Sequence, residues 1–240
     1  MLAFRALRQG LKFSYENWRM WANYMMVAVD VGELAEATRA MTRVVEQRAE
    51  KDGAACVDED VLGRLVDAVT RADPPSYDTD TDINNVRNTA TNSNAGYGLL
   101  PRVLDLLERT LLPRVSSPRI FRAYARVLTW QGNRWADVLK AHLDAYRVGP
   151  AGQMSSTGTG TGTAPNALTT DVVRWRGAVG EVEEVVDVLR NFGPRVEGSR
   201  WLFQARSIVR SFMGRTKDFE EEEEWGRLVG LQEELRQEGA

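Results

Sequence analysis

Apolar positions recur with a helical period along most of the chain, and no stretch alternates apolar and polar residues as a half-buried strand would. Between Val57 and Arg71 the apolar positions are 57, 61, 62, 65, 66 and 69, which share one helical face. Leu99 to Val115 and Thr170 to Asn191 show the same spacing. The pattern therefore predicts an all-α chain.

The stretch from Asn17 to Val45 predicts two short amphipathic helices joined by a tight turn at Gly32. A glycine past a helix end adopts positive φ without strain, and the small Ala37 lets two helices approach to about 8–10 Å. Both features match the tetratricopeptide repeat (TPR), a helical hairpin of about 34 residues. The repeat-defining positions in this copy are Trp21, Tyr24, Gly32 and Ala37.

A second, degenerate copy of this repeat is predicted between Arg119 and Arg147. With Gly132 on the turn position, Phe121 and Tyr124 take the places of the first-helix aromatics. One hairpin cannot bury its apolar face alone, so neighbouring hairpins must supply the rest of the core. The predicted fold is a TPR-like helical-hairpin solenoid, a right-handed α-superhelix, with disordered polar insertions.

The first thirteen residues, MLAFRALRQGLKF, allow two interpretations. They are amphipathic, basic and free of acids, as in a mitochondrial transit peptide. Counting back one repeat from Trp21, however, places Ala3, Leu7 and Gly10 on second-helix positions. The second interpretation is favoured: the chain begins halfway through an earlier repeat, and upstream TPR repeats are expected to pack against it.

Two polar segments interrupt the helical pattern. Residues 72–98 are rich in Asp, Asn, Thr and Ser and predict a disordered insertion. Their acids at 78, 80 and 82 lack the glycine and the closing glutamate of an EF-hand calcium loop. Residues 149–166 predict a mobile Gly/Ser/Thr linker, whose alternating glycines follow no predicted strand and therefore form no nucleotide-binding fingerprint.

These features define the predicted layout of the chain. It consists of a half TPR, a full TPR and a following helix (1–71), the disordered insertion (72–98), a helix and a degenerate TPR (99–148), the linker (149–166) and a C-terminal helical cap (167–240). Within the cap, a first helix ends at Phe192-Gly193-Pro194, Ser199 begins a second, and a third runs from Lys217 to Glu238.

Composition excludes several classes of function. A net charge of -3 gives no global basic field for nucleic acid, and no apolar run reaches the roughly 18–20 residues of a membrane span. The single Cys56 and the single His142 cannot build a zinc site, and no nucleophile, base or cofactor motif accompanies them. We therefore expect a protein without enzymatic activity and without a cofactor or metal.

The first helices of a TPR array line its concave groove. In this chain the groove positions include Arg19 and Met26, then Arg119, Arg122 and Arg126. Arg122 and Arg126 resemble two cations of a carboxylate clamp, but Met26 cannot supply the others. A mixed apolar and basic groove favours helical or extended segments of protein partners. The acidic run Glu220–Glu224 is interpreted as a solvated helix start.

The sequence also resembles one particular family. The signature in GLKFSYENWRMWANYMMVAVDVGELAEATRAMTRVVEQR is similar to the C-terminal repeat region of the tetratricopeptide repeat protein 27 family. The likeness covers residues 3–71 well and 119–147 loosely. It implies a non-enzymatic eukaryotic TPR scaffold, with a yeast member linked to cell-wall integrity. It further implies a chaperone-linked role in assembling large complexes, among them the spliceosomal U-five snRNP.

Two functional hypotheses follow. In the first, the chain is a protein–protein interaction scaffold of the cytoplasm, with the nucleus as a second location. In the second, it is a purely structural C-terminal cap of a longer solenoid and has no partner site of its own.

Overall fold

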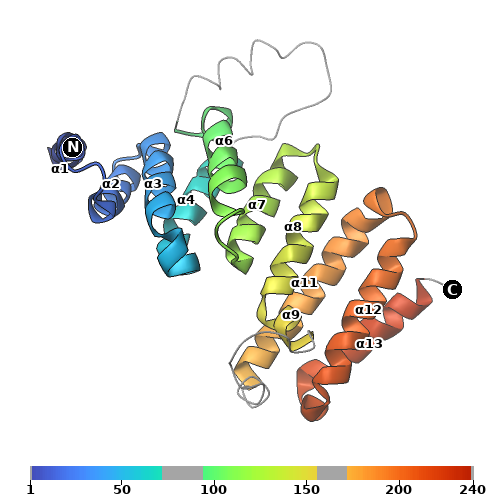
Figure 1. Cartoon of the computed structure of the whole chain (residues 1–240). Coiled ribbons are helices and arrows are strands. Elements are labelled where there is room, and N and C mark those ends of the chain that lie inside the picture. The colour runs from blue at the N-terminus through green and yellow to red at the C-terminus, as the bar shows by residue number, and fades with distance from the viewer. Residues whose placement is uncertain (1, 72–93, 156–171, 239–240) are drawn as a thin grey trace, which may run out of the picture. The chain divides into compact units, whose positions relative to one another are not determined.

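The computed structural model describes residues 2–71, 94–155 and 172–238, and every regular element within these ranges is helical (Figure 1). The all-α prediction is therefore confirmed for this part of the chain. The chain divides into two compact units, Met1–Arg134 and Trp135–Ala240. No helix in the described ranges is long and apolar enough to cross a membrane.

The first unit is a series of helical hairpins. Its elements are α1 (Leu2–Gly10), α2 (Trp18–Asp30), α3 (Leu34–Asp52), a 3-10 turn (Gly53–Cys56), α4 (Glu59–Thr70), α6 (Gly96–Asp105), a π-helical segment η2 (Leu106–Leu111) and α7 (Pro118–Gln131). Helices α2 and α3 pack against each other along their length, and α1 packs on α2. This arrangement is that of a hairpin preceded by a single helix.

The α2–α3 hairpin is built by the residues that define the repeat. Trp21, Tyr24 and Ala37 are 3%, 1% and 0% exposed. The chain reverses at Gly32, whose φ of 79° lies in the left-handed region that glycine adopts without strain. At the start of α2, the Asn17 side chain accepts a hydrogen bond from the backbone N–H of Arg19 at 3.1 Å and caps the helix.

A second hairpin joins helices that are distant in the sequence. Helix α4 packs against α6, and α3 packs against both α6 and η2. Helix α4 and the continuous segment α6–η2 therefore form a second hairpin beside α2–α3. The sequence had indicated only a lone packing helix at 57–71. In η2 the backbone N–H of Leu112 bonds to the carbonyl of Leu107 at 2.9 Å, one residue wider than an α-helical bond.

The insertion predicted at 72–98 needs a correction at its end. Residues 72–93 lie outside the described part, but α6 already begins at Gly96. Asn94 bonds to the start of α3, accepting from the backbone N–H of Ala35 at 2.9 Å and donating to Glu33 at 3.2 Å. These bonds, which the sequence pattern does not reveal, fix residues 94 and 95 beside α3.

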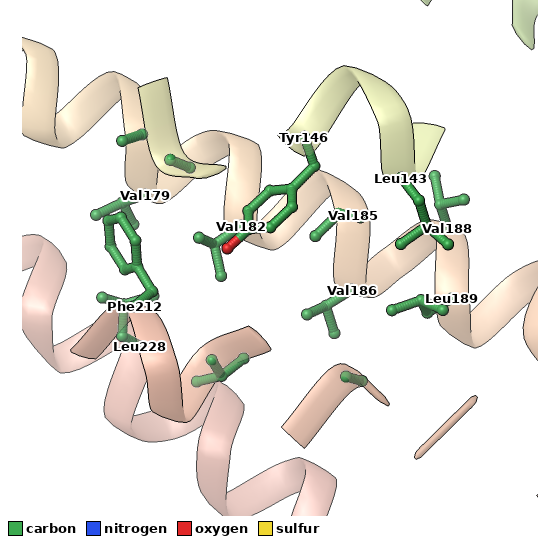
Figure 2. Packing of buried hydrophobic residues seen from close by; sticks show 14 of the residues in the cluster. Leu143, Tyr146, Val179, Val182, Val185, Val186, Val188, Leu189, Phe212 and Leu228 are labelled. Atoms are coloured by element: carbon green, nitrogen blue, oxygen red, sulfur yellow. The ribbon is translucent and has the colours of Figure 1, made fainter. Parts of the chain in front are cut away.

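The second unit is also helical and has its own core. Its elements are α8 (Trp135–Val148), α9 (Pro150–Ser155), α11 (Val172–Val196), α12 (Arg200–Arg215), a 3-10 turn η3 (Lys217–Phe219) and α13 (Glu223–Gln237). Figure 2 shows the packed centre, where valines of α11 meet Tyr146 of α8, Phe212 of α12 and Leu228 of α13. Trp175 is fully buried and stacks on Phe219 with ring centroids 4.8 Å apart.

Three boundaries predicted in the second unit are wrong. The linker predicted at 149–166 begins with helix α9, because Pro150 is well placed in a first turn and the buried Ala151 donates its N–H to Glu181 at 3.1 Å. Residues 156–166 lie outside the described part. Helix α11 continues through Pro194 and ends two residues later at Val196, so the proline stands in its last turn. The helix predicted at 217–238 is divided into η3 and α13.

The degenerate repeat predicted at 119–147 spans the boundary between the units. Helix α7 ends at Gly132, whose φ is 76°, and Tyr124 is buried while Phe121 is half-buried. Helix α8 begins at Trp135 and belongs to the other unit. The pairing of α7 with α8 as one repeat stays a prediction.

Candidate protein-interaction surface

Three first helices of the first unit are linked by ion pairs on one face, which we call the first-helix face. Arg64 of α4 reaches Asp30 of α2 at 3.8 Å. Arg126 of α7 reaches Asp67 of α4 at 2.7 Å. All of these side chains are at least one-third exposed, so the helices α2, α4 and α7 share a charged surface in which Asp30 and Asp67 each meet a cation of the next helix.

A third pair lies at the other end of α7. The Arg119 guanidinium donates to Glu59 of α4 at 2.5 Å, and the buried Ser117 hydroxyl donates to the same carboxylate at 3.3 Å. Asp58 begins α4 by accepting from the backbone N–H of Val61 at 3.0 Å. An open pocket of about 490 Å³ lies here, lined by Ala54, Ala55, Val57, Asp58, Glu59, Asp60 and Arg119.

The residues predicted for the groove therefore lie in different surroundings. Met26 is 46% exposed on α2, and Arg122 is half-buried on α7. Arg119 and Arg126 are exposed, yet each is bonded to an acid of α4. A clamp of free arginines is thus absent from these two positions, because neighbouring carboxylates already bind them.

Arg19 belongs to a separate cluster on α2 and α3. Its guanidinium lies 5.5 Å from the ring centre of Trp18, and that of Arg48 lies 4.4 Å from the same ring. Arg48 in turn donates to Asp52 at 2.5 Å. Cation–π contacts at a partly exposed ring contribute about 0.5–1 kcal/mol each, so the cluster orients Arg19 beside the indole.

Six residues of the ion pairs, four acids and two arginines, were not predicted as surface residues: Asp30, Glu59, Asp67, Glu108, Arg64 and Arg134. Glu108 of η2 accepts from the Tyr124 hydroxyl at 2.8 Å and from Arg134 at 2.5 Å. The sequence does not show which neighbouring helix a charged surface residue will contact. Only the packing of α4 on its neighbours, and of η2 on α7, brings these partners together.

Neither reactive side chain of the chain forms a catalytic arrangement in the described part. Burial, together with the charge of Asp52, raises the pKa of the Cys56 thiol, which keeps it in its unreactive form. His142 lies on α8, with its Nδ1 3.8 Å from Glu184. The described residues contain no cluster of three or more acidic, histidine or cysteine side chains that could hold a metal ion.

The fold and this surface define an all-α helical-hairpin protein. Comparison with known proteins specifies the class further, although no family model matches the sequence and no solved structure matches it significantly. The chain is 30% identical over 98% of its length to a TPR repeat-containing protein of Schizosaccharomyces pombe, of which it covers 26%.

Two further relatives carry informative names. "Essential for maintenance of the cell wall protein 1" of Saccharomyces cerevisiae is 24% identical over 97% of this chain, which covers 24% of that protein. "Tetratricopeptide repeat-containing protein trd-1" of Caenorhabditis elegans is 30% identical over 51% of the chain and is covered over 15% of its own length.

The chain is therefore homologous to TPR proteins, and the predicted resemblance to the tetratricopeptide repeat protein 27 family is confirmed. The TPR-like helical fold is confirmed with it. The chain spans about a quarter or less of the length of these relatives. This homology supports a role in protein–protein interaction.

Proposed function

We propose that the chain is a protein-interaction scaffold that presents its first-helix face to segments of partner proteins. The observation that carries this proposal is the set of partly exposed ion pairs across α2, α4 and α7 beside the exposed Met26. An exposed ion pair contributes only about 0–1 kcal/mol. A partner carboxylate can therefore take over Arg119 or Arg126 at little cost, while Met26 offers an apolar contact.

We further propose that the whole protein works as a chaperone-linked cofactor in the assembly of large complexes, such as a spliceosomal snRNP. This part rests on the family resemblance, and its locations would be the cytoplasm and the nucleus. The name of the budding-yeast relative, which refers to the cell wall, belongs to that protein. Disturbed assembly of a defined complex after depletion of the protein would test it.

Quantitative affinity purification with a charge-reversed pair tests the scaffold proposal. Arg119→Glu with Arg126→Glu should lower recovery of partner proteins by on the order of tenfold or more, because it places acids where partner carboxylates must bind. Both side chains are exposed, at 70% and 58%, so the fold should persist. Circular dichroism checks that it does.

The matched control reverses two exposed arginines of the neighbouring helices. Arg39→Glu on α3 with Arg109→Glu on η2 changes the net charge equally and also breaks exposed ion pairs. Partner recovery should stay at the wild-type level. Equal recovery from both variants, with normal helicity, would instead support the structural cap without a partner site of its own.

A further inference from the structure

The outward side of α12 carries basic residues around an exposed phenylalanine. The residues Arg200, Phe203, Ser207, Arg210 and Gly214, which we call the α12 stripe, follow one another at three- and four-residue steps. That spacing keeps them on one face of a helix. All five are exposed, and Phe203 is 78% exposed.

The opposite side of α12 holds the helix in place. Ala205, Val209 and Phe212 are fully buried against α11 and α13. Arg206 donates through Nε and through Nη2 to the carbonyl of Leu235 at 3.0 and 2.6 Å, which fastens α12 to the end of α13. The stripe is therefore presented by a helix with a fixed rotation about its axis.

The charge of this region contrasts with the rest of the chain. Residues 198–217 contain no acid, and their basic residues are Arg200, Arg206, Arg210, Arg215 and Lys217, in a chain of net charge -3. On the first-helix face, Arg119 and Arg126 are bonded to acids. Within the described part, Arg200 and Arg210 take part in no ion pair. The stripe is thus a local cationic surface whose two arginines have no internal counter-charge.

The combination of arginine and an aromatic side chain indicates the chemistry of an occupant. Arginine and aromatic residues are enriched in the centres of protein interfaces, whereas lysine is depleted there. Arg200 and Arg210 lie ten residues apart, or about 15 Å along a helix, with Phe203 between them. Carboxylates with the same spacing on another helix would meet both arginines while an apolar side chain covers Phe203.

We propose that the α12 stripe binds an acidic amphipathic helix of a partner protein. Phe203 is its apolar anchor, and Arg200 and Arg210 bind the flanking carboxylates. An exposed helix offers no strand edge for an extended peptide, and helix-on-helix docking through apolar anchors at regular spacing is an established recognition mode. This surface belongs to the second unit and does not depend on the first-helix face.

Fluorescence anisotropy of the full chain with a labelled synthetic helix tests the proposal. The probe carries glutamate pairs about ten residues apart around two leucines, spaced to follow the helical rise. The control peptide has glutamine in place of each glutamate. The wild-type chain should bind the glutamate peptide at least tenfold more tightly, and Arg200→Glu with Arg210→Glu should abolish this preference.

Matched variants separate the stripe from general charge and folding effects. Arg5→Glu with Arg102→Glu changes the net charge equally at exposed sites of the first unit and should bind like the wild type. Phe203→Ser should weaken binding several-fold, and Phe203→Leu should preserve it. The proposal is overturned if the wild-type chain does not bind the glutamate peptide, if the Arg200 and Arg210 variant binds it equally, or if oligouridine RNA or phosphatidylserine vesicles bind the stripe more tightly than the peptide.

Discussion

At the scale of single residues, Tyr24 combines packing and polar bonding at the centre of the first hairpin. Its ring stacks on Phe4 at 5.0 Å and meets the edge of Trp21 at 6.1 Å. Its hydroxyl donates to Glu36 of α3 at 3.1 Å, which ties the two helices together. Burial, reinforced by the charge of Glu36, raises the pKa of Tyr24 to about 12.

This raised pKa predicts a loss of stability at high pH. Because the folded-state pKa lies above the ordinary value of 10.0, the folded state favours the neutral phenol, and the stabilisation is complete below pH 10 and is lost as pH rises toward 12. Because the hydroxyl is only partly buried and solvent screens its charge, the loss should stay below about 2 kcal/mol. Denaturant unfolding of wild type and Tyr24→Phe between pH 9 and about 12 measures it. Parallel curves for the two proteins would contradict the assignment.

Two glycines of α11 predict opposite effects of the same substitution. A Cβ on Gly193 would lie 2.4 Å from the Cβ of Trp201, so Gly193→Ala should destabilise the protein by about 1–3 kcal/mol. Gly180 is exposed, and a Cβ there meets nothing within 4 Å, so Gly180→Ala should stabilise it by about 0.5–1 kcal/mol. Thermal unfolding of both variants tests the close approach of α11 and α12. The packing is misassigned if Gly193→Ala has no effect.

At the scale of elements, the helical period identified most helices but not all of their partners. Val57 to Arg71 was correctly predicted as a helix, yet its pairing with α6 could not be seen because residues 72–93 separate the two. The composition of Pro150–Ser155 led to the prediction of a linker, but these residues form a short helix. Glu181 stabilises this helix by accepting a hydrogen bond from the backbone N–H of Ala151. Local pattern predicts a helix, whereas its neighbours depend on contacts distant in sequence.

The candidate surface shows the same division. Counting repeat positions from Gly132 placed Arg119 and Arg126 on the first helix of the degenerate repeat. In the structure both side chains are exposed on α7. Their partners Glu59 and Asp67 could not be predicted, because α4 lacked the repeat positions that would have set its rotation. The sequence therefore predicted the two exposed arginines but not the two acids that pair with them.

The exposed ion pairs predict a weak coupling between α4 and α7. A double-mutant cycle of Asp67→Asn and Arg126→Gln should give a coupling energy below about 1 kcal/mol that falls with added salt, since Arg126 is exposed and Asp67 is partly exposed. Urea unfolding of the four proteins measures this energy. A coupling above about 2 kcal/mol would mean that a partner cannot readily take over Arg126.

At the scale of the whole molecule, the chain consists of two compact units with separate cores. Phe212 is fully buried in the second core, so Phe212→Ala should cost about 3–5 kcal/mol there. Hydrogen exchange should accelerate in α8, α11, α12 and α13 and remain at the wild-type rate in α2, α3 and α4. Equal acceleration in both units would show that they unfold as one.

The proposed scaffold function requires that partner proteins contact the first-helix face of the first unit. Site-specific photo-crosslinking in cells tests this most directly, with the photoreactive residue at Met26 on α2 or at Glu50 on α3 in the whole protein. Both positions are exposed. A discrete cross-linked partner protein is expected from position 26, absent from position 50 and lost in the Arg119→Glu, Arg126→Glu variant. Cross-links from position 50 alone, or from neither position, would contradict it.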